Sequence, residues 1–254
     1  MIIGFLGTGH ITSSVIEGIS KSKLKIKKIY ISPRNKSLAK KLSKRFKKVS
    51  ISKNNQQLVD KSDWIFLAIT PSVGRKILSK LHFRRNKKII SFISTINIKE
   101  LKKFTKNNNL TRVIPLPFIG TRKGPIIICP INKKVKSFFS HLGSPIEIKN
   151  EKLSRGFWST SSFMAPYYHL YLNTSNWLIS KGIKKKEAEE YIRNLFLALS
   201  FDAVNKKKLS LKQLVLESQT SRGTNAYVLK ELKKKKFYKV QQKVLNSVFK
   251  KFKT

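Results

Sequence analysis

The sequence of 254 residues has little cysteine, few acidic residues and no long apolar run. Its one cysteine, Cys129, excludes an internal disulfide. The longest apolar runs, near 64–69 and 89–93, fall well short of the roughly 18 residues that a membrane-spanning helix needs. The apolar start of the chain leads directly into a glycine turn, which is unlike a signal peptide. We therefore expect a soluble, cytoplasmic protein.

Acidic residues are scarce beside basic ones: 12 Asp and Glu against 55 Lys and Arg give a formal charge of +43. Such a charge attracts any polyanion, whether nucleic acid, an anionic membrane surface or a phosphorylated cofactor. The lysines are spread along the whole chain, with no recognised nucleic-acid-binding motif and no metal-ligand spacing among them. We favour compositional drift on solvated surfaces and expect no metal site. Nucleic-acid binding remains an open alternative.

The most informative stretch is the N-terminus, where the apolar run 2–6 ends in a Gly-x-Gly turn. A helical periodicity follows over 12–19, and strand, glycine turn and helix in this order form the context of a dinucleotide site. Gly7 permits the turn, and Gly9 lets the backbone approach a pyrophosphate held on helix N–H groups. A purely structural turn is the alternative. The predicted pyrophosphate-binding residues are Gly7, Thr8, Gly9, His10 and Ile11.

The segment after the second predicted strand, 26–32, indicates which dinucleotide is bound. NAD-preferring sites place an Asp or Glu near the end of this strand to accept hydrogen bonds from the ribose 2′-OH. No acid follows this strand, and Arg34 offers a forked donor that suits a 2′-phosphate. We therefore predict NADP(H) as the cofactor, with NAD as the alternative. The predicted 2′-phosphate contacts are Ser32, Arg34, Asn35 and Lys36.

Strands and helices alternate over the first 150 residues. Further strands are expected at 49–52, 64–71, 88–94, 110–115, 125–129 and 145–148, and helices at 37–46, 73–81, 98–104 and 135–142. This alternation predicts a Rossmann-type, mostly parallel sheet covered on both faces. Ligands bind at the carboxyl ends of such strands, so we expect Ala68, Thr70 and Pro71 to face the dinucleotide.

The chain changes character near residue 150, after which strand signals nearly vanish. An aromatic-rich, almost uncharged stretch at 157–179 predicts one buried helix, and more helices are expected at 185–203, 211–217, 225–235 and 237–252. We predict a dinucleotide-binding domain at 1–150 and an all-helical domain at 151–254. The apolar surface of the helical part exceeds what one compact unit can bury, which favours pairing with a second copy.

Five segments, in order along nearly the whole chain, resemble the pyrroline-5-carboxylate reductase family. Gly7-Thr8-Gly9-His10-Ile11-Thr12 resembles the family's Gly-x-Gly-Asn-Met-Ala turn. Residues 55–59 and 62–71 are similar to its Asn-x-x-x-Val and Asp-x-x-x-Leu-Ala-Val-Lys-Pro segments. Arg112-Val113-Ile114-Pro115 resembles its Arg-x-Met-Pro, and 220–225 falls where the family has Thr-Ser-Pro-Gly-Gly-Thr-Thr.

The resemblance implies an NADPH-dependent reductase that converts pyrroline-5-carboxylate to proline. It also implies a dimer joined through the helical domains, with the active site at the dimer seam. On matching positions it adds Asn55 to the cofactor cleft formed by Ala68, Thr70 and Pro71. It further implies that Gly223, Thr224 and Asn225 bind the substrate, and that Thr224 and Asn225 are the catalytic residues. Arg222 beside them either clamps the substrate carboxylate or is a solvated residue at a helix start.

The sequence departs from the family pattern in both halves. His10 and Thr70 replace an Asn and a Lys in the cofactor half, and in the substrate loop Arg222 replaces Pro or Gly and Asn225 a Thr. Two alternatives therefore stay beside the reductase. One is a non-catalytic or regulatory dinucleotide-binding protein with a drifted substrate loop. The other is a nucleic-acid or anionic-membrane binder that uses its charge and the basic amphipathic helix at 237–252.

Overall fold

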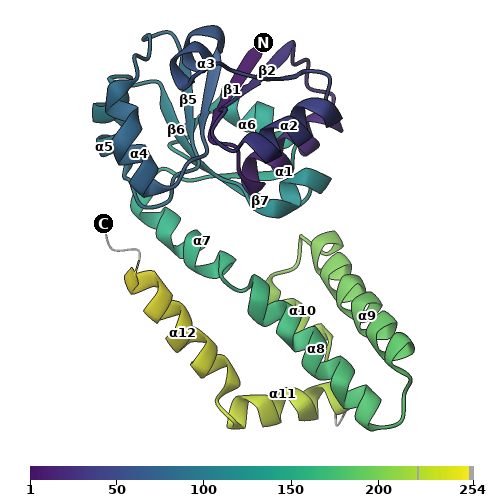
Figure 1. Ribbon diagram of the computed structural model, residues 1–254. Helices are drawn as coiled ribbons and strands as arrows, with labels where there is room; N and C mark the ends of the chain where they lie inside the picture. Colours follow the sequence, from purple (N-terminus) through teal and green to yellow (C-terminus); the bar gives the residue numbers. More distant parts are fainter. Residues whose placement is uncertain (222, 252–254) are drawn as a thin grey trace. The chain divides into compact units, whose positions relative to one another are not determined.

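The computed structural model describes residues 1–221 and 223–251 and divides them into two compact units. Unit 1 comprises residues 1–158, and unit 2 comprises residues 159–251. The predicted domain boundary at 150/151 lies shortly before this division. Unit 1 alternates strands with helices, whereas the described part of unit 2 is helical (Figure 1). The predicted fold class, a mostly parallel α/β sheet followed by an all-helical region, is confirmed.

Residues 1–158 form an eight-stranded sheet in the order β3-β2-β1-β4-β5-β6-β7-β8. All neighbouring strands pair in parallel except β6 and β7, which are antiparallel. The strands are β1 (Ile2–Leu6), β2 (Lys28–Ile31), β3 (Val49–Ile51), β4 (Trp64–Leu67), β5 (Lys88–Ser91), β6 (Leu110–Ile114), β7 (Pro125–Cys129) and β8 (Ser144–Glu147).

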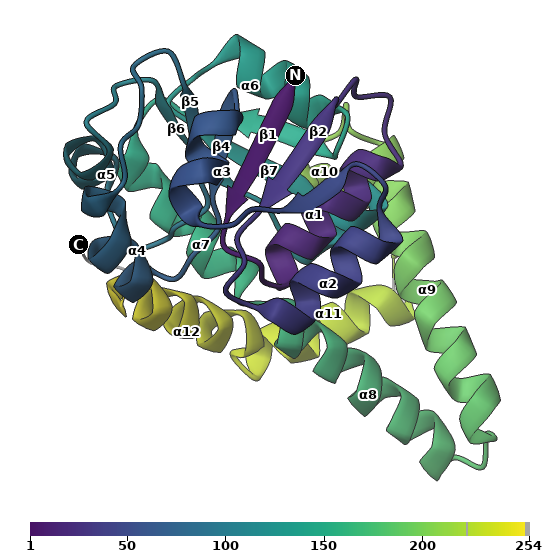
Figure 2. The same ribbon diagram turned by 45° about the horizontal axis from the view of Figure 1, so that its top comes forward.

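Helices cover both faces of this sheet. Side chains of α1 (His10–Ser20), α2 (Lys36–Arg45) and α6 (Lys133–Ser140) share one core cluster, and α1 and α2 lie side by side on that face (Figure 2). Side chains of α3 (Asn55–Lys61), α5 (Ile98–Thr105) and the 3-10 turn η1 (Leu78–Lys80) share the cluster on the other face. Helix α4 (Pro71–Ile77) precedes η1, and η2 (Pro117–Thr121) packs beside α1.

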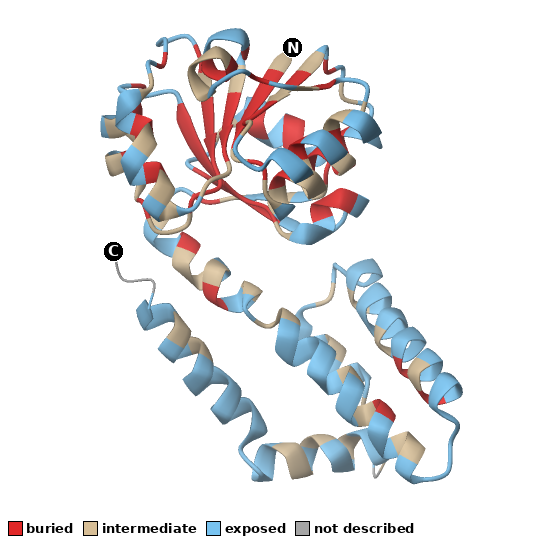
Figure 3. Ribbon diagram, in the orientation of Figure 1, coloured by how far each residue is buried: buried red, intermediate tan, exposed pale blue. Residues whose placement is uncertain are grey.

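The central strands are apolar because both of their faces are covered. Phe5 and Phe66 stack on neighbouring strands with ring centroids 4.6 Å apart, and both are fully buried. The strands of the sheet carry much of the buried colour in Figure 3. Strand β4 ends at Leu67, earlier than its apolar run suggests. Its neighbours explain this end, because Leu67 pairs with the last residues of β1 and β5, Leu6 and Ser91. Beyond that register no strand remains to pair with, and the ends of β1, β4 and β5 lie at one edge.

Unit 2 corrects the prediction of one helix over 157–179. Helix α7 (Ser154–Ser161), which follows η3 (Glu151–Leu153), ends at Ser161, and α8 (Met164–Ser180) starts after a turn at Phe163. Pro166 explains the break, because a proline inside a continuous helix would clash with the carbonyl of Ser162 and donate no hydrogen bond to it. In the first turn of α8 its missing N–H costs nothing.

Helix α8 and α9 (Lys185–Asn205) form an antiparallel hairpin, followed by α10 (Leu211–Glu217), α11 (Thr224–Lys234) and α12 (Phe237–Lys251). Many apolar side chains of the hairpin are exposed in the single chain: Tyr168 is 57% exposed and Trp177 59%. The predicted burial of this aromatic stretch is therefore not seen within the single chain.

Candidate functional site

The glycine turn after β1 contains one glycine that the fold requires and one that it does not. Gly7 has a φ of +109°, and a Cβ there would collide with the backbone carbonyl of Ala68. Gly9, the N-cap of α1, has an ordinary φ of −122°, and a Cβ there would have no described atom within 4 Å. Gly7 is thus explained by packing inside the protein. Gly9 instead leaves open space in front of the first turn of α1.

The first turns of α1 and α4 differ from those of α2, α3, α5 and α6. Asparagine side chains cap α2, α3, α5 and α6, accepting a hydrogen bond from a backbone N–H in each first turn. Among the described residues, no side-chain cap is formed on α1 or α4. The first-turn N–H groups of α1, and those of Ser72 and Val73 after Pro71 in α4, can therefore receive an anionic ligand, helped by the positive end of each helix dipole.

The strands before α1 and α4 flank the point where the strand order reverses. From β1 the chain moves outward to β2 and β3, and from β4 it moves the other way to β5 and β6. In open α/β sheets, ligands bind at the carboxyl ends of the strands at such a switch point. The open helix starts therefore lie where this topology places a dinucleotide.

Three predicted cofactor residues hold the turn itself. The Gly7 N–H donates to Ser32 Oγ (3.0 Å), and Thr8 Oγ1 donates to the Ser32 carbonyl (2.7 Å). Ser32 Oγ in turn donates to Asn55 Oδ1 at 2.8 Å, which ties the end of β2 to the start of α3. Thr12 Oγ1 donates to the Gly7 carbonyl (2.8 Å) and closes the turn from the helix side. Thr8, Ser32 and Asn55 thus use these polar groups to shape the crevice.

The remaining predicted cofactor residues are distributed along the same sheet edge. Arg34 and Lys36 are exposed just after β2, and between them Asn35 accepts from the Leu38 N–H (3.2 Å) to cap α2. His10 is exposed at the first position of α1. After β4, Ala68 lies against the glycine turn, and Thr70 and Pro71 start α4. Ile11 packs against the core.

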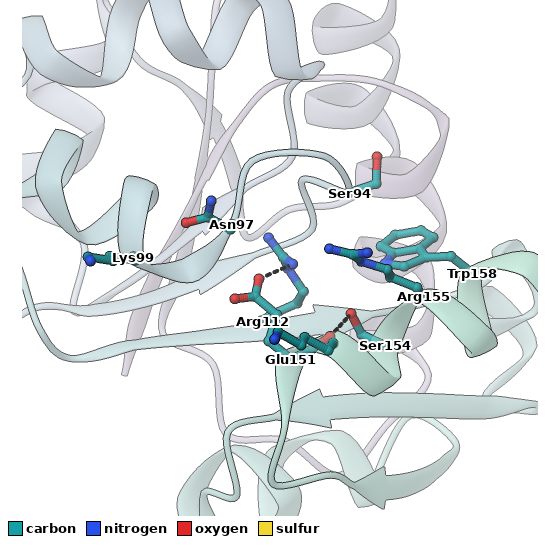
Figure 4. A pocket seen from close by; sticks show the side chains of 9 residues that line it. Ser94, Asn97, Lys99, Arg112, Glu151, Ser154, Arg155 and Trp158 are labelled. Carbon is teal, nitrogen blue, oxygen red and sulfur yellow. Dashed lines mark hydrogen bonds and ion pairs between the residues drawn. The ribbon is translucent and has the colours of Figure 1, made fainter. Parts of the chain in front are cut away.

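The sequence predicted no role for a cavity of about 280 Å³ that lies beside the loop after β5 (Figure 4). Arg112 in this cavity is only 3% exposed, and its guanidinium donates from Nη1 to Glu151 and from Nη2 to the Ile96 carbonyl. Glu151 also accepts from the Ile98 N–H at 2.9 Å and 3.0 Å. Other lining residues include Ser94, Asn97, Lys99 and Lys152.

Burial shifts the electrostatics of this cavity. Loss of hydration lowers the pKa of the Arg112 guanidinium, while the charge of Glu151 opposes the shift. A single arginine in the apolar strand 110–114 was the sequence signal for the cavity, since a buried arginine needs a partner. Its partner lies 39 residues later in the chain, where no local pattern identifies it.

The predicted substrate loop lies in unit 2, between α10 and α11. Arg222 falls outside the described residues. Gly223 is the N-cap of α11, and a Cβ there would collide with Thr220 Oγ1. No side-chain cap forms on α11 among the described residues, so the amides of its first turn are open, and Thr224 is exposed beside them. Asn225 Nδ2 donates to the Ser218 carbonyl at 2.9 Å and fastens the loop.

Within residues 1–221 and 223–251, no group of three or more His, Cys, Asp or Glu side chains could hold a metal ion. Over the same residues, no helix combines the length and apolar character needed to cross a membrane.

Comparison with known proteins connects this geometry to a family. Residues 2–97 match the family model described as NADP oxidoreductase, coenzyme F420-dependent. The pyrroline-5-carboxylate reductase of Staphylococcus haemolyticus is 26% identical over 239 residues, covering 88% of this chain and 86% of that protein. The chain is thus similar over most of its length to pyrroline-5-carboxylate reductases, at 24–26% identity. The resemblance stated from the sequence is confirmed.

Solved structures of such reductases share the fold. The pyrroline-5-carboxylate reductase of Streptococcus pyogenes matches with a TM-score of 0.83 at 22% identity, covering 99% of this chain and 98% of that one. The Plasmodium falciparum pyrroline carboxylate reductase, solved with NADP bound, matches with a TM-score of 0.82 at 20% identity, over 99% and 97%. The likeness to these reductases therefore includes the helical unit as well as the sheet.

Proposed function

We propose that the protein is an NADPH-dependent oxidoreductase that reduces the imine of pyrroline-5-carboxylate to give proline. The observation that carries this proposal is the pair of uncapped helix starts, α1 and α4, at the switch point of the sheet. A ligand with a diphosphate suits the open space in front of Gly9, where a Cβ would meet no described atom. The similarity to reductases over most of the chain supports the same assignment.

The cofactor would lie along the carboxyl edge of β2, β1 and β4. The amides at His10 and Ile11 would receive the diphosphate, while Arg34 and Lys36 would take the 2′-phosphate. Both cationic side chains are exposed, and their residues follow the end of β2. Strand β2 pairs with β1, the strand that precedes the glycine turn. No carboxylate occurs between residues 32 and 37 to repel a 2′-phosphate, which supports NADPH over NADH.

The substrate would be anchored by the start of α11. Its open first-turn amides and the hydroxyl of Thr224 can donate to a carboxylate or to the ring nitrogen. Asn225 keeps the loop in place through Ser218 and can present its remaining polar atoms to the substrate. Bound NADPH supplies the hydride for the imine carbon. The protein's task is then to orient the ring and to keep the imine nitrogen protonated.

The α8–α9 hairpin would join two subunits. Apolar side chains project from α9 with high exposure, including Leu197 (63%) and Phe201 (65%). An exposed apolar surface of this kind marks an association site. We expect Leu197→Asp to convert a dimer to a monomer in light scattering after gel filtration. Asn205→Asp adds the same charge at the end of the same helix and should leave the dimer intact.

One assay tests the central proposal: oxidation of NADPH, followed at its absorbance maximum, with pyrroline-5-carboxylate as the acceptor. We expect turnover with NADPH to exceed turnover with NADH. Calorimetry on the same preparation measures cofactor binding separately. Binding without turnover would instead support the regulatory dinucleotide-binding alternative, and no binding of either nucleotide by folded protein would refute both.

A further inference from the structure

A second cavity, of about 600 Å³, lies at the edge of the sheet away from the proposed cofactor crevice. Two segments line it: residues 79–85, which lead into β5, and residues 104–106, where α5 ends ahead of β6. Strands β5 and β6 are parallel to each other and to β4, so these segments meet at the amino ends of the strands. The four residues of β5 span about 13 Å, which separates this cavity from the carboxyl ends where we place the dinucleotide.

The lining of this cavity is strongly cationic. Lysine and arginine supply four of its ten lining residues, against 55 of 254 in the whole chain, and no described Asp or Glu lines it. The four are Lys80, Arg84, Arg85 and Lys106, and all are exposed. Among the described residues, none of them takes part in an ion pair. Their positive charge is therefore available to an anionic ligand instead of being neutralised inside the protein.

Two amide side chains hold the backbone of this lining in place. Asn107 is 2% exposed, and its Nδ2 donates to the carbonyls of Arg84 (3.0 Å) and Lys87 (3.1 Å). Gln56 Nε2 donates to the His82 carbonyl (3.0 Å), and Gln56 Oε1 accepts from the His82 N–H (2.9 Å). A fixed backbone lowers the conformational entropy that is lost when a ligand binds. The cations of the cavity thus extend from a preorganised frame.

The aromatic residues of the lining favour phosphate groups over nucleic-acid bases as the ligand. Phe83 is 4% exposed, and it shares with Phe104 the core cluster on this face of the sheet. Single-stranded nucleic acids are held by bases that stack on accessible aromatic rings. Both phenylalanine rings are committed to the core, whereas the exposed side chains of the lining are mostly cations. The volume also falls within the range of about 300–1,000 Å³ typical of small-molecule pockets.

We propose that this cavity binds a chain of linked phosphates, carried either by a nucleoside triphosphate or by inorganic polyphosphate. Arg84 and Arg85 supply two planar forks that suit the paired oxygens of a phosphate group. Lys80, at the end of η1, and Lys106, just after α5, add charge from the two segments that meet here. A phosphate chain concentrates several negative charges in a short length, which four cations match better than they match a single carboxylate. This site is separate from the cofactor crevice and does not rest on the reductase function.

The first test compares two cavity arginines with two lysines elsewhere. Arg84→Ala/Arg85→Ala removes two charges from the lining, and Lys40→Ala/Lys41→Ala removes two exposed charges from α2, which does not line the cavity. Calorimetry with inorganic tripolyphosphate at low ionic strength measures Kd for each protein. We expect the arginine pair to weaken binding about 10- to 100-fold, because charge-assisted contacts are lost, and the lysine pair to weaken it less than about twofold. No binding by wild type, or equal effects of the two pairs, would overturn the proposal.

The arginine variant should fold, because the fold uses the backbone of these residues and not their side chains. Among the described residues, the Arg84 carbonyl accepts from Asn107 and from the Lys87 N–H, and neither guanidinium makes a hydrogen bond. Circular dichroism checks the fold. If the variant does not fold, Lys80→Gln tests the same cavity with Lys40→Gln as its control. Lys80→Gln should weaken tripolyphosphate binding about three- to tenfold, and equal affinities of the two single variants would contradict the proposal.

Three ligands identify the source of the phosphates. ATP, tripolyphosphate and a single-stranded oligonucleotide are each titrated into wild type and into a folded cavity variant, and the difference between the two proteins isolates binding in this cavity from binding in the crevice. Tighter binding of ATP would assign the site to a nucleoside triphosphate, and affinity for ATP equal to or below that for tripolyphosphate would assign it to the phosphate chain alone. Both results support the proposal. An oligonucleotide that binds more tightly than either, and loses that affinity in the variant, would make this surface a nucleic-acid site and overturn the proposal.

Discussion

Replacing Gly9 by alanine should weaken NADPH binding in a folded protein, whereas the same replacement at Gly7 should destabilise the fold. At Gly7 the added Cβ meets the Ala68 carbonyl, and the φ of +109° is unfavourable for any residue with a side chain. Backbone strain of about 1–3 kcal/mol and overpacking of about 1–3 kcal/mol together remove about 2–6 kcal/mol from the free energy of unfolding. That is a large share of the roughly 5–15 kcal/mol that holds a domain together.

At Gly9 the added Cβ meets no described atom, and the φ of −122° suits alanine. The free energy of unfolding should fall by less than about 1 kcal/mol, because the sole expected cost is that alanine is a poorer N-cap residue than glycine. The methyl group would, however, occupy the space that the diphosphate needs. Loss of one charge-assisted hydrogen bond costs about 1.5–3 kcal/mol, which corresponds to about 10- to 150-fold in Kd.

Urea unfolding followed by circular dichroism measures the first quantity, and calorimetric titration with NADPH measures the second. The two measurements should distinguish the variants, because Gly7→Ala should lose stability and Gly9→Ala should lose NADPH affinity. Wild-type NADPH affinity in Gly9→Ala would refute the placement of the diphosphate at the start of α1.

Three further predictions follow from single groups. Arg34→Ala should weaken NADPH binding about 10- to 150-fold and leave NADH binding unchanged, since only the 2′-phosphate contact is lost; calorimetry with both nucleotides checks this. Burial raises the pKa of the Cys129 thiol to about 11, so an aromatic disulfide reagent at pH 8 should label the unfolded chain and spare the native one. The hydrogen bond from Lys136 holds the pKa of Glu147 below its usual 4.5. The ionised Glu147 therefore stabilises the fold above pH 4.5, and this stabilisation is lost as the pH falls through the lowered pKa. Lys136→Ala should therefore shift acid unfolding, followed by circular dichroism, to higher pH, and the exposed Lys134→Ala should not.

Much of the fold was predictable because its signals are local. The glycine turn, the absence of an acid after β2 and the apolar runs of the strands each occupy a few neighbouring residues, and the predicted strand at 125–129 matches β7 residue for residue. The same holds for α10, whose predicted range 211–217 is the observed one. The cofactor residues predicted from these patterns lie along one edge of the sheet. Their roles remain predictions.

The features that sequence reasoning missed depend on contacts between distant segments. Arg112 and Glu151 are 39 residues apart, and nothing near either one indicates the other. The antiparallel pairing of β6 with β7 depends on η2, which returns the chain to the sheet without a covering helix. The division between α7 and α8 had a local signal in Pro166, but the continuous aromatic pattern around it favoured one long helix.

The open starts of α1 and α4 leave the empty protein with less than its attainable stability. A ligand that binds only the folded state raises the free energy of unfolding by about 2.7 kcal/mol when present at a hundred times its Kd. Asparagine at position 9 could cap α1 as Asn35, Asn54, Asn97 and Asn132 cap their helices. Such a cap would raise the free energy of unfolding of the ligand-free protein. The free energy of unfolding of this protein should therefore rise with the concentration of free nucleotide around it.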